Sequence, residues 1–229
     1  MKSMKILSVA LAALVAASVF VIPVSAENTT DTAKMAASQV FDQQKVAQMS
    51  ALIKSKVKVA DFKAPKTENN LSLSATITSA PSDYPTRKGQ ILITDDAYKG
   101  LIPTGHSAIV YSATQVVESV SSGVVMGKND WWSSKNSSAA GSVSSTTTTQ
   151  DADAAEWCKG QVGKPYNFNY FNTGTRSSFY CSQLVWASFL DKYGINLNTD
   201  AYSTSLGNPV HPLELLANDL TYISYKYNW

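Results

Sequence analysis

The sequence predicts an α+β domain in which a small antiparallel sheet packs against a helix that carries a cysteine. Three observations lead to this fold class. Short runs rich in β-branched residues, separated by turn residues, fill residues 89–120 and predict neighbouring strands. Two helical segments follow after residue 150. The composition, 44% hydrophobic and only 16% charged, excludes a disordered, collagen-like or coiled-coil chain and fits a domain with a hydrophobic core.

The predicted strands come first in the domain. Gly89–Thr94 follows a turn and predicts the first strand. Gly105–Tyr111 and Val116–Val120 predict a second and third strand joined by a tight turn. The Ser- and Thr-dense stretch at residues 133–150 has two interpretations: a low-complexity loop, or a polar edge strand at Ser142–Thr149, because threonine favours strands.

Two predicted helices follow the strands. The first covers Asp151–Gln161, where Asp151 is a good N-cap and the first turn is acidic. The second begins at Ser178 or Tyr180 and is closed by Gly194, because glycine readily adopts the left-handed conformation that ends a helix.

The first 26 residues predict a secretory signal peptide. Lys2 and Lys5 precede the apolar run Ile6–Ile22, and Val24–Ala26 offers the small side chains that signal peptidase needs. The alternative is an uncleaved membrane anchor, because the run is almost long enough to span a bilayer. The polar residues Glu27–Thr30 favour cleavage. We therefore expect a secreted or cell-wall-associated protein with no stable membrane span.

The charge balance argues against nucleic acid as a partner. The whole chain has a formal charge of +2, from 19 basic and 17 acidic side chains. The predicted signal peptide contains two lysines and no acidic residue, so the mature chain has 17 of each and a net charge of zero. A neutral chain has no long-range attraction to a phosphate backbone. We expect a monomer whose partner is its substrate.

Residues 27–86 predict a region appended to the main domain, which covers residues 87–229. A helix between Thr30 and about Val59 is indicated by an apolar stripe, formed by Val40, Phe41, Val46, Met49, Leu52 and Ile53. The Pro-, Ser- and Thr-rich stretch Asp61–Thr86 predicts a linker, with one short strand at Leu71–Ile77. We interpret the region as a helix and a tether. The alternative, a pro-segment that covers a site, stays open.

The sequence predicts no metal centre and no cofactor. The chain has only two histidines, His106 and His211, and no His-Glu-x-x-His or Cys-x-x-Cys motif. Gly123–Lys128 lacks the spacing of a phosphate-binding loop. His211 precedes Pro212 at a predicted helix start, so we interpret it as a loop or capping residue.

Cys181 is the candidate nucleophile because it lies at the start of the second predicted helix. Leu184 and Phe189 share its face, which therefore turns toward the core. A helix N-terminus presents unpaired N–H groups and about half a positive charge, which stabilise a thiolate. The same N–H groups can hold an oxyanion, and a nearby imidazole would complete an activated nucleophile. The alternative, a small buried apolar residue, is our interpretation of Cys158.

Export also raises the question of a disulfide. In an oxidising compartment the default expectation for two cysteines is that they pair. One bridge between Cys158 and Cys181 would not be a disulfide framework for a domain of this size. Either the two are joined or at least one thiol is kept free.

His106 has a candidate partner on the next predicted strand. A lone histidine on an apolar face is usually a core residue, but Glu118 lies between Val116 and Val120, where a buried carboxylate needs a partner. A carboxylate beside His106 would fix its tautomer and stabilise the imidazolium. An odd number of loop residues, such as Ser112–Thr114, places both on one face of the sheet. An even number places them on opposite faces, barring a bulge.

These motifs together resemble one enzyme family. The relevant segments, in chain order, are Gly89–Ile93, Gly105–Val110, Val116–Ser119, Gly163–Asn167 and Tyr180–Trp186. They are similar to the permuted papain-like cysteine hydrolases of the YiiX and YycO type, which are circularly permuted relatives of the NlpC cell-wall peptidases. The resemblance covers about residue 88 to the C-terminus, and as in that family the histidine strand precedes the cysteine helix. This chain has Gln90 where the family often has Asp.

The resemblance implies a circularly permuted papain-like fold and a cysteine peptidase or amidase activity. It implies Cys181 as nucleophile, His106 as base and Glu118 as the residue that orients the imidazole. With export, it implies peptidoglycan peptides, or N-acyl amino acid and lipid amides, as substrates.

Four aromatic residues are candidates for the walls of the substrate cleft, with core or surface packing as the alternative for each: Tyr166, Tyr180, Trp131 and Trp132. Two other functions stay open. One is a non-catalytic cell-wall-binding or adhesive module on the same fold. The other is a lipid acyltransferase or thioesterase, because the same three side chains serve any acyl carbonyl.

Overall fold

The computed structural model describes residues 37–64, 80–96 and 105–229. The predicted signal peptide and the predicted strand at Leu71–Ile77 lie outside these ranges.

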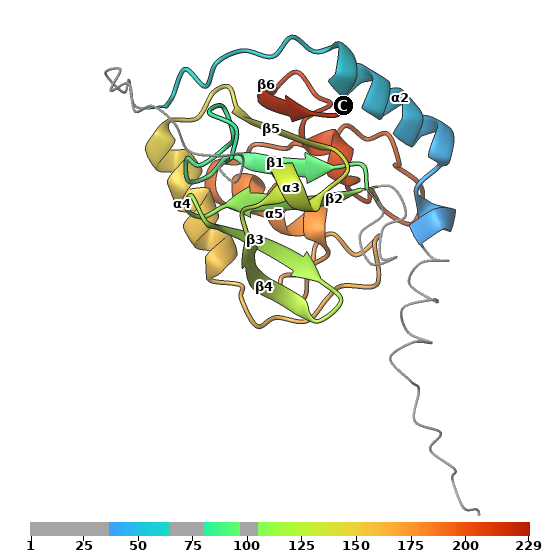
Figure 1. Cartoon of the computed structure of the whole chain (residues 1–229). Helices are drawn as coiled ribbons and strands as arrows, with labels where there is room; N and C mark the ends of the chain where they lie inside the picture. The colour runs from blue at the N-terminus through green and yellow to red at the C-terminus, as the bar shows by residue number, and fades with distance from the viewer. Residues whose placement is uncertain (1–36, 65–79, 97–104) are drawn as a thin grey trace, which may run out of the picture.

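A six-stranded antiparallel sheet forms the centre of the domain (Figure 1). Its spatial order is β4-β3-β2-β1-β5-β6. The strands are β1 (Ile91–Thr94), β2 (His106–Val110), β3 (Gln115–Val120), β4 (Gly123–Lys128), β5 (Ser138–Val143) and β6 (Thr221–Tyr227). The first three strands fall where the sequence predicts them. β1, β2 and β3 are neighbours in the sheet, and none of the three is an edge strand.

The Ser- and Thr-rich stretch contributes an interior strand rather than a loop or a polar edge strand. Every residue of β5 is buried, and β5 pairs with β1 on one side and β6 on the other. Its small residues explain this position, because an added Cβ at Gly141 would lie 2.0 Å from the Tyr222 carbonyl oxygen. The threonines that follow it belong to the turn and to the next helix.

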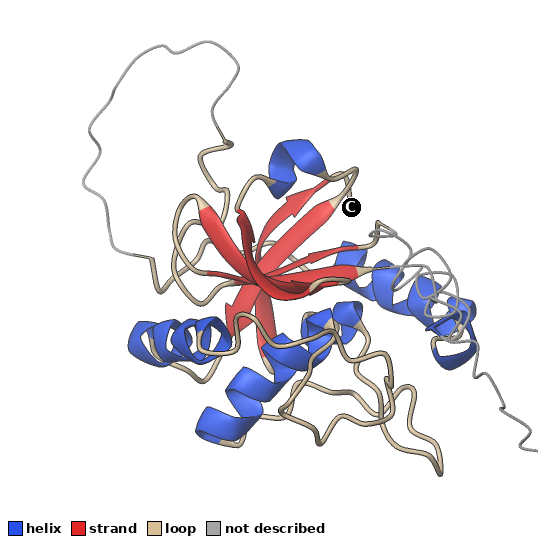
Figure 2. Ribbon diagram, turned by 90° about the horizontal axis from the view of Figure 1, so that it is seen from below, coloured by secondary structure: helices blue, strands red, loops and turns tan. Residues whose placement is uncertain are grey.

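The helices lie mainly on one side of the sheet, with the short helix α3 on the other (Figure 2). The helices described are α2 (Gln43–Ser55), α3 (Trp131–Ser134), α4 (Thr148–Lys159), α5 (Cys181–Tyr193) and the 3₁₀ helix η1 (Pro212–Leu215). α4 begins earlier than predicted, since Thr147 rather than Asp151 is its N-cap: the Thr147 hydroxyl accepts from the Gln150 N–H at 3.2 Å. As predicted, α5 ends at Gly194, with φ 67°.

The two faces of the sheet carry separate apolar clusters. Ile93, Ile109 and Val117 belong to the main core, which also contains Leu184 and Phe189 of α5. On the other face a smaller cluster forms, made of Tyr84, Leu92, Ala108, Val116, Trp131, Ala140 and Tyr225. Alternation along β2 therefore sends odd-numbered residues toward α5 and even-numbered residues toward Trp131.

The N-terminal region packs into the main core. α2 buries Val46, Met49 and Ile53, whereas Leu52 of the predicted stripe is 44% exposed. Phe41 is fully buried, and its ring packs edge-on against Tyr170, Tyr202 and His211. After α2 the chain runs along β6, where the Val59 N–H donates to the Ile223 carbonyl at 2.9 Å. This part of the predicted helix-and-tether region thus contributes to the domain core.

A buried ionic network anchors the end of this region. Arg87 bonds Asp61 at 2.7 Å and Asp151 of α4 at 2.8 Å, and Lys63 bonds Asp151 at 3.1 Å. The Asp151 carboxylate is fully buried and pairs with the side chains of Arg87 and Lys63. It therefore does not cap α4.

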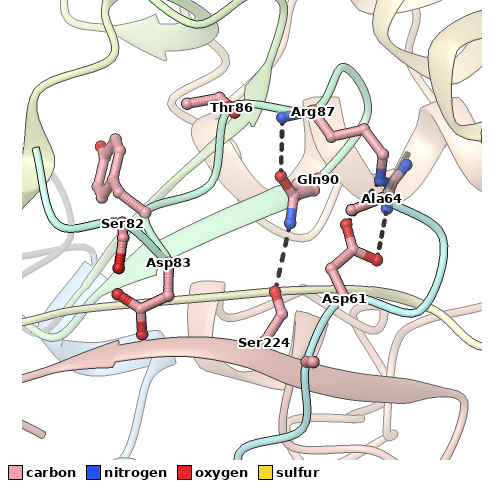
Figure 3. Close-up of a pocket in the computed structure, with 10 residues that line it drawn as sticks. Asp61, Ala64, Ser82, Asp83, Thr86, Arg87, Gln90 and Ser224 are labelled. Atoms are coloured by element: carbon pink, nitrogen blue, oxygen red, sulfur yellow. Dashed lines mark hydrogen bonds and ion pairs between the residues drawn. The ribbon is translucent and has the colours of Figure 1, made fainter. Parts of the chain in front are cut away.

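Figure 3 shows the Asp61–Arg87 contact at the wall of a pocket of about 580 Å³. Gln90, which stands where the resembled family often has Asp, lines this pocket between Arg87 and Ser224. It accepts from the Arg87 N–H at 3.0 Å and donates to Ser224 at 3.3 Å. Gln90, the residue just before β1, therefore connects this part of the chain to β6.

Candidate active site

Cys181 is the first residue of α5 and is 2% exposed. The helix N-terminus is held by Gln183, whose side-chain oxygen accepts from the Tyr180 N–H at 3.2 Å and from Asn167 at 2.9 Å. The Gln183 amide also donates to loop carbonyls, including that of Asn172. Two motifs that are separate in sequence, Gly163–Asn167 and Tyr180–Trp186, therefore meet at the cysteine. This role of Gln183 is not predicted from the local pattern, although Gln183 lies within the Tyr180–Trp186 motif.

His106 and Glu118 lie on the same face of the sheet. In the β2–β3 pair Ala108 is opposite Glu118, and the Tyr111 N–H donates to the Gln115 carbonyl at 2.9 Å. The loop between the strands is therefore Ser112–Thr114, the odd-numbered case. His106 Nε2 lies 2.6 Å from Glu118 Oε2, and both side chains are buried. The remaining ring nitrogen, Nδ1, faces the cysteine.

A hydrogen bond joins the Cys181 thiol to the His106 imidazole. Burial alone would lower the pKa of His106, but the Cys181 thiolate and the Glu118 carboxylate outweigh it and raise the pKa to about 9. Burial alone would raise the pKa of Cys181, but the His106 charge and the Ser107 N–H and hydroxyl outweigh it, so the pKa is lowered. The two charges stabilise each other, which favours the thiolate–imidazolium form of the pair.

Two buried hydroxyl groups, those of Ser107 and Tyr166, interact with Cys181. Ser107 Oγ and Tyr166 Oη have no regular hydrogen-bond partner among the residues described. Burial and the nearby Cys181 charge raise the pKa of Tyr166, so its hydroxyl stays protonated and can donate. Buried polar groups are normally paired, and the interaction given for the Ser107 hydroxyl is with the Cys181 sulfur, whose charged form it favours.

Comparison with known proteins shows the family to which the chain belongs. The family model described as "Permuted papain-like amidase enzyme, YaeF/YiiX, C92 family" matches residues 93–208. The chain belongs to this family. The resemblance and the α+β permuted papain-like fold expected from the sequence are thereby confirmed. A papain-like amidase family supports the hydrolase class predicted from the sequence.

Two individual proteins are also similar. YycO, an uncharacterized protein of Bacillus subtilis strain 168, is 29% identical over 137 residues, which cover 58% of this chain and 54% of YycO. The chain thus matches about half the length of that relative. The crystal structure of the metalloprotein YiiX from Escherichia coli O157:H7 covers 62% of this chain and 98% of its own, with 18% identity and a TM-score of 0.45.

In this papain-like domain Trp131 covers the histidine. Its ring stacks on His106 at 5.4 Å between centroids and 26° between planes, and Trp131 is only 2% exposed. The Tyr84 hydroxyl accepts from the Trp131 N–H at 2.9 Å and donates to Asn129 at 2.8 Å. Trp132 is partly buried against the same cluster. Trp131 therefore packs on the imidazole instead of lining an open cleft.

Tyr180 is a structural anchor in the papain-like domain. Tyr180 is fully buried. Its hydroxyl accepts from the Val210 N–H at 3.0 Å and donates to the Tyr170 carbonyl at 3.2 Å. Of the four aromatic residues considered as cleft walls, Tyr166 and Tyr180 have pKa values that the Cys181 charge raises, and Tyr166 is the one whose hydroxyl lacks a regular hydrogen-bond partner among the residues described.

A small pocket of about 290 Å³ adjoins the buried carboxylate. It is lined by Glu118, Lys128, Asp130, Trp131, Ser134 and Lys135. Glu118 therefore contacts His106 and also lines a polar pocket, which Trp131 lines as well.

His211 caps η1, as predicted. Its Nδ1 accepts from the Leu213 N–H at 3.2 Å, and burial lowers its pKa to about 3. It is therefore a neutral structural residue.

The second cysteine of the papain-like domain is structural. Both cysteines are free thiols, so the disulfide alternative does not hold. Cys158 is fully buried, its thiol donates to the Leu184 carbonyl at 3.6 Å, and burial raises its pKa to about 12. At neutral pH Cys158 is therefore an inert thiol, whereas the pKa of Cys181 is shifted in the opposite direction.

The described ranges show neither a metal-ligand cluster nor a membrane-spanning helix. Within them, no three His, Cys, Asp or Glu side chains gather as metal ligands would. Within the same residues, no helix has the length and apolar character needed to cross a membrane.

Proposed function

We propose that this protein is an exported cysteine amidase that hydrolyses an amide bond by acyl transfer to Cys181. The observation that supports this proposal is the buried succession of thiol, imidazole and carboxylate, formed by Cys181, His106 and Glu118, at the N-terminus of α5. Of the two cysteines, both among the residues described, Cys181 has a pKa that a histidine partner lowers, whereas burial raises the pKa of Cys158.

The first step forms an acyl-enzyme. The Cys181 thiolate attacks the amide carbonyl carbon, and a C–S bond forms while the carbonyl π electrons move to oxygen. The tetrahedral intermediate then breaks its C–N bond, and the leaving nitrogen takes the proton from His106 Nδ1. Glu118 accepts a hydrogen bond from His106 Nε2 throughout, which holds the ring plane and stabilises the imidazolium.

The oxyanion needs donors placed beside the thiol. The backbone N–H of Cys181 lies in the first turn of α5, where it has no helical partner, and the helix dipole favours negative charge there. The Tyr166 hydroxyl is a second candidate donor because it is buried, protonated and close to Cys181.

The second step releases the acyl group. His106, now neutral, takes a proton from a water molecule, and the hydroxide oxygen attacks the thioester carbonyl. The C–S bond breaks and its electrons return to sulfur, which restores the thiolate and the imidazolium. Trp131 supports both steps by covering the His106 ring, since a drier environment strengthens the His106–Glu118 interaction.

The substrates proposed are peptidoglycan peptides, or N-acyl amino acid and lipid amides. The predicted signal peptide supports a substrate outside the cytoplasm, and the family supports an amide bond. Within this proposal the protein acts as a secreted or cell-wall-associated monomer.

The test is trapping of the acyl-enzyme. The mature chain is incubated with peptidoglycan stem peptides and with N-acyl amino acids, then quenched in acid and analysed by peptide mass spectrometry. We expect an acyl adduct on Cys181, product release, and loss of both in Cys181→Ala. Cys158→Ala is the matched control and should keep the activity, because Cys158 is a buried neutral thiol. Equal hydrolysis by Cys181→Ala and wild type would overturn the proposal.

A further inference from the structure

Ser107 is a buried serine whose hydroxyl has the Cys181 sulfur as its neighbour rather than a backbone carbonyl. It follows His106 on β2, is 0% exposed and points to the α5 side of the sheet, as Ile109 does. Its Oγ has no regular hydrogen-bond partner among the residues described. An unpaired buried hydroxyl destabilises a fold, because desolvation is not compensated.

Neighbouring buried serines behave differently. Ser119, which follows Glu118 as Ser107 follows His106, donates to the Phe179 carbonyl at 2.6 Å. Ser182 donates to the Val210 carbonyl at 2.7 Å, and Ser188 to the Val185 carbonyl at 2.7 Å. All three are fully buried, as Ser107 is. The unpaired state of Ser107 is therefore not a general property of serines in this core.

The group beside Ser107 is the thiol of Cys181. Both the N–H and the hydroxyl of Ser107 interact with this sulfur and favour its ionised form. A neutral thiol is a weak hydrogen-bond acceptor, whereas a thiolate is a charged and much stronger one. The hydroxyl thus gains a good acceptor only when the sulfur is charged.

We propose that Ser107 is a positioning residue whose hydroxyl donates a hydrogen bond to the Cys181 thiolate. This inference rests on the proposed role of Cys181 as the nucleophile. When the proton moves from Sγ to His106 Nδ1, the S–H bond breaks, an N–H bond forms, and the Ser107 O–H turns toward the sulfur without losing its own proton. The same hydrogen bond stabilises the thiolate that leaves when water cleaves the acyl-enzyme.

Other titratable groups face the sulfur and must be separated from this effect. They are His106 on β2 and the hydroxyls of Tyr166, Tyr170 and Tyr180. Burial raises the pKa of each tyrosine, that of Tyr170 to about 12, so none of the three titrates in the range used below. His106 remains as the competing influence and needs its own variant.

The experiment is iodoacetamide alkylation of Cys181 from about pH 5 to 9, located by mass spectrometry, on the folded mature chain. No substrate is needed. In Ser107→Ala we expect the pH of half-maximal alkylation to rise by about one unit, the size of a hydrogen bond to a charged acceptor. The melting temperature should stay the same or rise, because an unpaired buried hydroxyl is removed.

Ser119→Ala is the matched control. It should lower the melting temperature, because it removes a formed hydrogen bond, and leave the alkylation midpoint at the wild-type value. Should Ser107→Ala fail to fold, Ser107→Thr and Ser107→Val form a pair of equal shape that differs by the hydroxyl. The threonine variant is then expected to titrate at lower pH than the valine variant.

Each outcome has a distinct meaning. An unchanged midpoint in Ser107→Ala, or equal midpoints for the threonine and valine variants, overturns the inference. If His106→Ala shifts the midpoint upward while Ser107→Ala does not, the nucleophile proposal survives and only the role of Ser107 fails. If neither variant shifts it, activation of Cys181 fails as well.

Discussion

Gly127 on β4 lies directly against the carboxylate of Glu118 on β3. An added Cβ at Gly127 would be 2.0 Å from Glu118 Oε1 and 3.1 Å from Val116 Cγ2. Gly127 has no unusual backbone conformation to explain its identity, since it is not among the positive-φ residues. The absence of a side chain at this position therefore gives the carboxylate the room in which it meets His106.

We expect Gly127→Ala to impair catalysis by displacing Glu118. A displacement of about 1 Å in an orienting group lowers kcat/KM by about a hundredfold. The measurement is kcat/KM of the amidase reaction together with the alkylation profile of Cys181. Gly174→Ala is the control, because an added Cβ there meets no atom within 4 Å. Wild-type activity in Gly127→Ala would show that the carboxylate position is not needed.

Glu118→Gln tests the electrostatic part of the same contact. The active form needs a charged imidazolium, and the carboxylate helps to raise the pKa of His106 to about 9. Removing the negative charge lowers that pKa, so the alkaline limb of the kcat/KM profile should move to lower pH by about one unit. Glu156→Gln removes a carboxylate at the exposed Lys88 pair and should leave the limb in place. An unmoved limb in Glu118→Gln would separate Glu118 from the His106 titration.

The Tyr84 hydroxyl is expected to stabilise the fold around Trp131. It makes two hydrogen bonds, with the Trp131 N–H and with Asn129. Tyr84→Phe should therefore lower the free energy of unfolding by about 1–3 kcal/mol, because both partners are buried. Urea unfolding followed by tryptophan fluorescence measures this. Tyr202→Phe is the matched control: its buried hydroxyl has no partner among the residues described, so no loss is expected.

Phe41 tests whether the N-terminal region belongs to the domain. Its ring is fully buried between Tyr170, Tyr202 and His211. Phe41→Ala should lower the free energy of unfolding by about 3–5 kcal/mol, as core truncations of aromatic residues do. Leu52→Ala, on the same region but 44% exposed, should change it by less than about 0.5 kcal/mol. Equal stability of Phe41→Ala and wild type would favour a detachable pro-segment, the alternative left open by the sequence.

Local patterns in the sequence predict much of the fold and of the candidate site. The β-branched runs predict β1, β2 and β3, because alternation and turn residues are local signals. The start of α5 is predicted at Ser178 or Tyr180 and lies at Cys181, one residue after Tyr180, and the closure at Gly194 follows from glycine chemistry. These features depend on neighbours within a few residues, so they can be inferred without a structure.

Other features depend on residues far apart in the chain. The position of β5 between β1 and β6 could not be inferred, because Ser, Ala and Gly show no strand periodicity and only the close packing of Tyr222 explains them. The apolar stripe does not show what Phe41 packs against, since its partners Tyr170 and Tyr202 lie more than a hundred residues away.

The sequence by itself determined the identity of the three candidate catalytic side chains, the helix that presents the thiol and the family of the domain. Only the tertiary structure decided that Glu118 faces His106, because that depends on a three-residue loop and on the space left by Gly127. It also decided that Trp131 covers the imidazole and that the Ser107 hydroxyl faces the thiol. The physical reason is that residue types and periodicity encode local conformation, whereas the distances that set pKa values arise when separate strands and helices pack together.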